Sequence, residues 1–354
     1  MTKKYKLTAL QVAKGVDLTN KNVIITGGYS GVGLETLKAL SQAKANIIVP
    51  ARNIEKAKQS LANIKNVTIE YCDLMDLSSV EAFANKFLET KNPLHILINC
   101  AGIMATPFAK SKDGFESQFA TNHLAHFLLT AKLYPALKQA NGARVVNVSS
   151  RGHRLLSFGS VASVLPNQNN LKQNVNSEQE IINFNNMEYN QREYNAWESY
   201  GLSKTANILF SLQLDNLAKK DNIRAFSVHP GLIPQTNLAK HLQANSKQDS
   251  LKFKLAKLLP LPAIINFTKL FKNIHPADRM KTNQQGAATV VYAAISNELN
   301  NQGGIYLEDC AIAPVVPNNS KEPFGVREYA YDVKLAKHLW EVSEKYTKTK
   351  FEIA

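Results

Sequence analysis

Tyr200 and Lys204 are the pair of side chains in this sequence best suited to proton chemistry. They stand four residues apart at the start of a helix-forming run, so both would lie on one face of a helix. A phenol with a pKa near 10 exchanges protons poorly at neutral pH, but a nearby ammonium can lower that pKa by about one to three units. General acid–base catalysis favours a pKa close to the working pH. The spacing indicates a lysine-tuned acid–base tyrosine, although alone it also fits two solvated side chains.

A glycine-rich turn, TGGYSGVG (26–33), follows the first apolar run of the chain and leads into a helix-like stretch. Gly27, Gly31 and Gly33 would let the backbone turn tightly and approach a pyrophosphate, which the N–H groups at the helix start could bind. A glycine-rich turn alone can be a plain strand–helix loop. Its place directly after the first strand favours a nucleotide site.

Short apolar runs alternate with amphipathic stretches over the first two-thirds of the chain. The expected strands are 22–26, 45–51, 66–72, 95–100, 143–150 and 223–230, and helix-like segments between them include 32–43, 78–89 and 116–137. Strands that alternate with helices predict a parallel sheet covered on both faces. The fold class is therefore α/β, with a doubly wound parallel sheet of the Rossmann type in a single domain, and ligands would bind beyond the carboxyl ends of the strands.

The composition describes an ordinary globular protein. Of the 354 residues, 44% are hydrophobic and 20% are charged, which excludes a disordered or collagen-like chain. There is no run of eighteen apolar residues and no apolar stretch behind the N-terminal lysines, so we expect no transmembrane helix, no signal peptide and a cytoplasmic location. The three cysteines form no CxxC pair, and we expect no metal site.

Several motifs in chain order resemble the short-chain dehydrogenase/reductase family over about residues 20–312. They are T-G-x3-G-x-G at 26–33, Asp73-Leu74, NCAG (99–102), the YxxxK pair and Pro230-Gly231. The segments NHLAHFLLT, VVNVSSRGHR, AWESYGLSKTAN, FSVHPG and GGIYLEDC are most similar to its retinol dehydrogenase/WW-domain oxidoreductase-like branch. Cys100 replaces the second Asn that the family usually shows. The family's threonine four residues after the Pro-Gly glycine is Gln235 here, followed by Thr236.

The resemblance implies a set of catalytic roles. NADPH would deliver hydride to a carbonyl carbon, Tyr200 would give the oxygen its proton, and Ser150 would hydrogen-bond that oxygen as charge develops. Lys204 would also hold the nicotinamide ribose, and Asn122 would position a water for proton relay. The implied cofactor-binding residues are Gly27, Tyr29, Ser30, Gly31, Val32, Gly33, Arg52, Asn53, Asp73, Leu74, Asn99, Ala101, Gly102, Tyr200, Lys204, Pro230, Gly231 and Ile233.

The end of the second strand bears on the choice between NADP and NAD. An NAD enzyme usually places an acidic residue there to bind the ribose 2′-hydroxyl, whereas this chain has Ala51, Arg52 and Asn53. An arginine offers a fork of donors that matches a 2′-phosphate. We therefore expect NADP, with NAD as the less favoured cofactor. The alternative is a plain surface arginine on a strand–helix loop.

Two segments interrupt the alternation of strands and helices. Ser150 and Tyr200 are fifty residues apart, more than the family needs, and a polar insertion rich in Asn and Gln at 159–186 accounts for the excess. The second segment, 232–285, would form a substrate lid. It contains nine Lys/Arg and two Asp, half of the net charge of +14. Outside the predicted 21–312 domain lie an N-terminal extension (1–20) and a C-terminal loop and helix (313–354).

The lid also carries the apolar residues from which we predict the substrate and partners. Within it, 251–276 mixes lysines with Leu, Ile and Phe. One interpretation is a pocket for a bulky lipophilic aldehyde, ketone or alcohol, retinal-like or steroid-like, with peripheral membrane contact through 251–276. The other is a helix pair packed on the core with its lysines in water. The resemblance further implies a homodimer.

Other functions remain open from the sequence. One is reduction of a carbon–carbon double bond, as in the light-dependent protochlorophyllide reductases, which resemble this branch. Another is a cofactor-binding scaffold without turnover, against which the intact Ser150, Tyr200 and Lys204 argue. No recognition motif supports specific nucleic-acid binding in spite of the charge. His123 and His126 stand three residues apart without a further ligand, so packing or surface roles are favoured over a metal.

Overall fold

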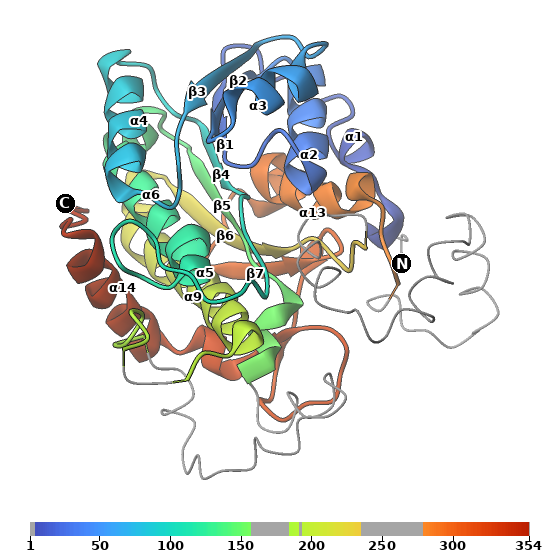
Figure 1. Cartoon of the computed structure of the whole chain (residues 1–354). Coiled ribbons are helices and arrows are strands. Elements are labelled where there is room, and N and C mark those ends of the chain that lie inside the picture. The colour runs from blue at the N-terminus through green and yellow to red at the C-terminus, as the bar shows by residue number, and fades with distance from the viewer. Residues whose placement is uncertain (1–3, 157–183, 191–192, 235–278, 354) are drawn as a thin grey trace, which may run out of the picture.

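The computed structural model describes residues 4–156, 184–190, 193–234 and 279–353, which form a three-layer α/β fold (Figure 1). Its central sheet has the strand order β3-β2-β1-β4-β5-β6-β7-β8, in which β8 alone runs antiparallel to its neighbour. This confirms the predicted doubly wound sheet. The strands are β1 Asn22–Ile25, β2 Asn46–Ala51, β3 Val67–Tyr71, β4 Ile96–Asn99, β5 Arg144–Val148, β6 Arg224–His229, β7 Ile305–Glu308 and β8 Ala311–Ile312.

Helices cover both faces of the sheet, which explains why the inner strands are buried on both sides. Every residue of β4 and β5 is buried. One face packs against α2 (Gly31–Gln42) and α13 (Asn283–Ile295), and the short α1 (Ala9–Val12) packs against these two helices. The other face packs against α4 (Leu77–Glu89), α6 (Ala125–Gln139) and α9 (Ala196–Ala218). The helix α3 (Ile54–Leu61) lies against the edge strand β3 (Figure 1).

The predicted helix over 116–137 is divided in the structure. A single turn, α5 (Ser117–Phe119), is followed by a π-helical turn at Ala120–Leu124 and only then by α6. In the π-helical turn the N–H of Ala125 donates to the carbonyl of Ala120, five residues back. One-turn π segments inside helices are frequent at functional sites, and Asn122 lies in this one.

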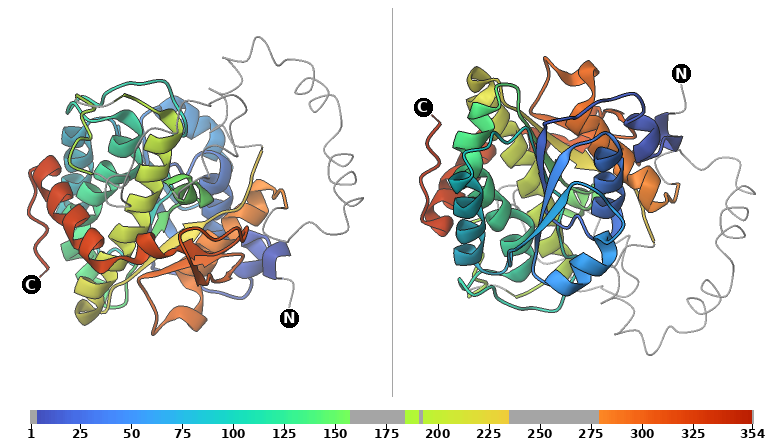
Figure 2. Two further views of the ribbon diagram at one scale, coloured as in Figure 1. Left: turned by 90° about the horizontal axis from the view of Figure 1, so that it is seen from below. Right: turned by 90° about the horizontal axis from the view of Figure 1, so that it is seen from above.

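The C-terminal part of the chain contributes more than a loop and a helix. The strands β9 (Val315–Val316) and β10 (Val326–Arg327) pair in parallel, and the helix α14 (Val333–Thr347) follows. It begins after Asp332, whose carboxylate accepts the N–H of Leu335 at 2.9 Å. It then packs along α9 on the outer surface of the molecule, as Figure 2 shows.

Most of the two predicted inserted segments lies outside the described residues. Of the polar insertion 159–186, only 184–186 are described, and the segment 251–276 of the lid is not. The two ends of the lid meet in the structure: Leu232 and Met280 form a β-bridge, and the N–H of Lys281 donates to the carbonyl of Leu232 at 2.8 Å.

Candidate functional site

The glycine-rich turn joins β1 to α2 in a conformation that requires glycine. Gly27 and Gly31 have φ angles of +68° and +53°, where a side chain would be strained. A Cβ on Gly33 would lie 2.4 Å from the carbonyl oxygen of Gly27. Ser30 occupies the N-cap of α2, but its side chain makes no capping hydrogen bond. The first N–H groups of α2 therefore remain available to an anion, as the nucleotide prediction requires.

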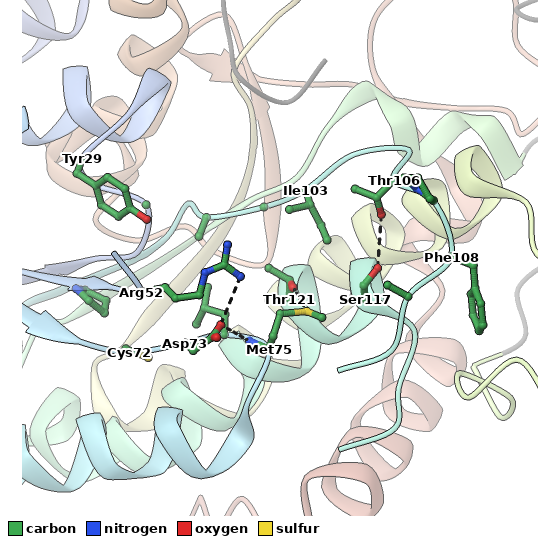
Figure 3. Close-up of a pocket in the computed structure, with 17 residues that line it drawn as sticks. Tyr29, Arg52, Cys72, Asp73, Met75, Ile103, Thr106, Phe108, Ser117 and Thr121 are labelled. Atoms are coloured by element: carbon green, nitrogen blue, oxygen red, sulfur yellow. Dashed lines mark hydrogen bonds and ion pairs between the residues drawn. The ribbon is translucent and has the colours of Figure 1, made fainter. Parts of the chain in front are cut away.

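A cavity of about 500 Å³ opens beside this turn at the carboxyl ends of the strands (Figure 3). Seven of the predicted cofactor-binding residues line it: Gly27, Tyr29, Arg52, Asp73, Leu74, Ala101 and Gly102. The rest of its wall comes from Pro50, Cys72, Met75 and Ile103 and from the segment around the start of α5, namely Thr106, Pro107, Phe108, Ala109, Ser117 and Thr121. The structure thus brings the ends of β1, β2, β3 and β4 together around one space.

Arg52 lies at the rim of this cavity, where it faces Asp73 (Figure 3). One guanidinium nitrogen is 3.9 Å from the carboxylate of Asp73, and the Arg52 side chain is 67% exposed. A pair this long and this exposed contributes little to stability, so Arg52 is free to bind a ligand. Asn53 has a local role instead, because its side chain accepts the N–H of Lys56 at 2.9 Å and caps α3.

Thr26 and Asn99 organise the site from inside the sheet. The hydroxyl oxygen of Thr26 accepts the N–H groups of Cys100 at 2.9 Å and Ala101 at 3.0 Å, which fixes the end of β4 against the end of β1. The Asn99 side chain does not line the cavity. It is buried in the sheet, where it donates to Thr130 and Asn147. Burial raises the pKa of the Cys100 thiol to about 12, so this cysteine is a neutral thiol.

Ser150, Tyr200 and Lys204 meet beyond the end of β5. Asn195 caps α9 through the N–H groups of Trp197 and Glu198, and Tyr200 and Lys204 follow one turn apart. A side-chain hydrogen bond joins Ser150 and Tyr200. The ammonium of Lys204 donates to the carbonyl of Val148 at 3.0 Å and lies 5.8 Å from the centre of the Tyr200 ring.

The pKa of Tyr200 is not lowered in the structure, as the sequence had predicted, but raised. Burial raises the pKa of Tyr200 to about 12, and the hydrogen bond from Ser150 only partly opposes this rise. Burial also lowers the pKa of Lys204 to about 8. Both shifts have one physical cause, because a dry environment disfavours the charged form of each group. At neutral pH the site holds a protonated tyrosine next to an ammonium.

Asn122 connects this cluster to the cavity. Its side-chain oxygen accepts the N–H of Ile103 at 2.9 Å, and its nitrogen donates to the carbonyl of Ile103 at 3.0 Å and to Ser203 at 2.9 Å. A Cβ on Gly102 would lie 3.0 Å from the Asn122 oxygen and 3.4 Å from the Lys204 nitrogen. Gly102 thus brings the cavity wall within contact of both groups.

The end of β6 supplies the remaining predicted residues. Gly231 has a φ of +99°, and the Lys281 side chain packs so closely that a Cβ on Gly231 would lie 2.5 Å from its Cδ. Lys281 forms an ion pair with Asp309. Ile233 packs against Gly286 on α13. Gln235 and Thr236 lie outside the described residues.

The two histidines near Asn122 are buried and take packing roles. His123 hydrogen-bonds Ser343 at 2.8 Å, and His126 bridges the hydroxyl of Thr26 and the carbonyl of Asn122 at 2.9 and 3.0 Å. The described part of the chain contains no group of three His, Cys, Asp or Glu side chains placed to hold a metal. Among the helices described here, none is long and apolar enough to cross a membrane.

Gly152 is a site residue that the sequence did not indicate. Its importance becomes visible only in the fold, where it lies against the ring of Tyr200. A Cβ at this position would lie 2.5 Å from Cε1 of the Tyr200 ring. We therefore expect Gly152→Ala to displace the tyrosine and to lower kcat by about 10- to 100-fold, measured in the NADPH-dependent reduction of an aldehyde that the sequence predicts. NADPH affinity and the unfolding midpoint are the controls. An unchanged kcat would show that the ring has room to move.

Comparisons with known proteins place this geometry in one family. The model for short chain dehydrogenases matches residues 21–162. Short-chain dehydrogenase/reductase prx1 from Penicillium roqueforti is 32% identical over 96% of this chain and 89% of its own length. Human retinol dehydrogenase 11 is 32% identical over 93% of this chain and 86% of its own length. An uncharacterized protein from Mycobacterium Paratuberculosis, known from its crystal structure, has a TM-score of 0.65 at 29% identity and covers 96% of this chain and 98% of its own.

The similarity to the two relatives and to the crystal structure extends over nearly the whole chain, and the glycine turn, the cavity and the Ser150–Tyr200–Lys204 cluster agree with it. The chain therefore belongs to the short-chain dehydrogenase/reductase family of nicotinamide-dependent oxidoreductases, in its retinol dehydrogenase-like branch.

Proposed function

We propose that this protein is an NADP-dependent oxidoreductase that interconverts the carbonyl and alcohol forms of a bulky lipophilic small molecule. The observation that carries the proposal is the cluster of the half-buried Ser150 with the buried Tyr200 and Lys204, which adjoins, at Gly102, a cavity with Arg52 at its rim. The relative named retinol dehydrogenase 11 supports a retinal-like aldehyde as the first substrate to test. The apolar lid segment 251–276, our expected membrane contact, lies outside the described residues and stays a proposal.

NADP would lie along the cavity with its 2′-phosphate at Arg52. The residues around the rim fit a phosphate better than a 2′-hydroxyl, because Ala51 provides no carboxylate and the Arg52 guanidinium is exposed. The free N–H groups at the start of α2 would bind the pyrophosphate, and Gly102 and Lys204 would lie at the nicotinamide half.

The chain's own groups can then perform the proton chemistry of carbonyl reduction. Bound NADPH supplies a hydride. Tyr200 keeps its proton at neutral pH because burial raises its pKa to about 12, and it can donate that proton to the carbonyl oxygen as negative charge develops there. Ser150, which is already hydrogen-bonded to Tyr200, would donate a hydrogen bond to the same oxygen. The Lys204 ammonium, 5.8 Å from the centre of the Tyr200 ring, would stabilise negative charge as it develops on the Tyr200 and carbonyl oxygens.

A fluorescence titration with NADPH and NADH tests the cofactor assignment. We expect the wild type to prefer NADPH, and Arg52→Ala to weaken NADPH binding by about 10- to 150-fold, because one hydrogen bond between charged groups is worth about 1.5–3 kcal/mol. NADH binding should hardly change. Lys58→Ala is the matched control, because Lys58 is an exposed cation on α3 that pairs with Glu55. If the wild type bound NADPH and NADH with equal affinity, the NADP preference would be wrong, but the assignment as an oxidoreductase would stand.

A further inference from the structure

The peptide that joins Ser150 to Arg151 is hydrogen-bonded by two histidine side chains. Regular sheet pairing ends one residue earlier, where the N–H of Ser149 donates to the carbonyl of Val228 at 2.8 Å. The Ser150–Arg151 peptide lies two peptide units further on, beyond this pairing, and its carbonyl accepts the N–H of His153 at 3.1 Å in the 3₁₀ turn that follows. Two histidine side chains also bond this peptide: His153 lies in the same turn, and His229 lies at the end of β6. His153 Nδ1 lies 2.8 Å from the Ser150 carbonyl oxygen, and the Arg151 N–H donates to Nδ1 of His229 at 3.2 Å.

These bonds require opposite tautomers of the two imidazoles. His153 must carry its proton on Nδ1 to donate to a carbonyl, and its Nε2 then accepts the N–H of Arg327 at 3.3 Å. His229 must leave Nδ1 unprotonated to accept an N–H, so its proton lies on Nε2. Burial lowers the pKa of His153 to about 3 and that of His229 well below its usual value, an effect that Arg151, Lys281 and Arg154 strengthen at His229. Both rings are therefore neutral.

Packing alone does not explain why a histidine occupies position 229. Its Nε2, the atom that carries the proton, is buried and has no hydrogen-bond partner among the described residues. A buried donor without a partner costs free energy. An apolar side chain of similar size would avoid that cost but would remove the Nδ1 acceptor of the Arg151 N–H.

The C-terminal segment holds His153 from the opposite side. Besides the bond from Arg327, the hydroxyl of Tyr329 donates to the carbonyl of His153. Glu308 at the end of β7 accepts the N–H of Gly325 at 2.7 Å, and Arg154 donates to the carbonyls of Glu322 at 3.0 Å and Gly325 at 2.5 Å. Residues 322–329, which follow the predicted catalytic domain, thus fix the turn that carries Ser150.

We infer that His153 and His229 are positioning residues that orient the catalytic serine by clamping the Ser150–Arg151 peptide between them. With the peptide fixed, the Ser150 side chain is held over Tyr200. Its oxygen accepts the N–H of Gly152 at 3.0 Å, and its side chain is hydrogen-bonded to Tyr200. The inference rests on the proposed function, in which Ser150 hydrogen-bonds the substrate oxygen.

Two substitutions of His229 test the clamp by turnover of retinal with NADPH. Asparagine places an oxygen near the position of Nδ1 and can accept the Arg151 N–H, whereas leucine cannot. We expect His229→Leu to lower kcat by about 10- to 100-fold with little change in NADPH affinity, and His229→Asn to restore most of the loss. His95→Leu is the matched control, because His95 Nδ1 also accepts a backbone N–H, that of Asn22 at 3.1 Å, but at the opposite ends of the strands. Equal losses in His229→Leu and His229→Asn would overturn the inference.

A double-mutant cycle separates positioning from general stabilisation. In a Ser150→Ala background, His229→Leu should cause no further loss of kcat, because the side chain that it orients is gone. If the double variant instead lost kcat by the product of the two single-variant losses, the clamp would be contradicted.

A spectroscopic measurement tests the clamp without any substrate, so its result does not depend on the proposed function. Imidazole ¹⁵N–¹H correlation spectra should show His153 protonated at Nδ1 and His229 at Nε2. The same tautomer at both rings would overturn the inference even in an active enzyme. Opposite tautomers in a protein that reduces no aldehyde would support the clamp, and the proposed reaction alone would fail.

Discussion

Replacing Tyr200 by phenylalanine should lower kcat by about 10²- to 10⁴-fold, the range in which a positioned general acid contributes to a reaction. The ring would keep its place beside Gly152, so the fold and the cofactor site should stay intact. What is lost is the proton that burial keeps on the phenol by raising its pKa to about 12. Single-turnover oxidation of NADPH with retinal measures the effect on the chemical step, and a parallel titration measures NADPH affinity.

The control for this substitution is another tyrosine with a hydrogen-bonded hydroxyl. Tyr292 on α13 donates to Glu298 at 2.8 Å and lies on the other side of the sheet. Tyr292→Phe should leave kcat unchanged. If Tyr200→Phe retained wild-type kcat while NADPH still bound, the proton would have to come from another group, and the proposed mechanism would be wrong.

The sequence predicts this site well because the chemistry lies where strands end. Parallel strands place their carboxyl ends at one edge of the sheet, so order along the chain is enough to bring Gly27, Arg52, Asp73 and Ala101 around one cavity. The i, i+4 spacing of Tyr200 and Lys204 is equally local. Features of this kind depend on the periodicity of strands and helices, which the sequence contains.

Features that depend on burial or on distant contacts were not predictable in the same way. The pKa of Tyr200 rises because the folded chain removes water from the phenol, which the spacing of Tyr200 and Lys204 does not indicate. The bond from Arg327 to His153 joins residues 174 positions apart. The π-helical turn within the expected helix 116–137 contains Asn122, whose side chain bonds Ile103 and Ser203 outside that helix. Each of these facts requires the tertiary structure.

The outer helix α14 bears on the expected homodimer, which stays a prediction. The resemblance implies pairing through helices next to the active site, and α14 covers part of that surface. It packs along α9, and its residue Trp340 contacts Phe127 of α6 and Phe210 of α9, with ring centres 5.2 and 5.9 Å apart. A dimer formed through α6 and α9 would therefore have to include α14 in its interface.

Trp340→Ala should lower the free energy of unfolding by about 3–5 kcal/mol, the usual loss when a large buried aromatic side chain is truncated. Trp340 is 7% exposed and also stacks on Phe351, with ring centres 4.7 Å apart. Urea denaturation measures the effect. Val333→Ala on the same helix is the control: Val333 is 60% exposed, so its loss should change stability by no more than about 0.5 kcal/mol.

The same variant shows whether α14 supports the fold or the chemistry. Trp340 contacts Phe210, six residues beyond Lys204 on α9, whereas Lys204 itself bonds the carbonyl of Val148 at the end of β5. We therefore expect kcat of Trp340→Ala, measured well below its unfolding midpoint, to equal that of the wild type. Equal stabilities of Trp340→Ala and Val333→Ala would show that α14 is not part of the cooperative core. If fully folded Trp340→Ala had a reduced kcat, α14 would instead determine the position of α9 and, with it, the position of the catalytic tyrosine.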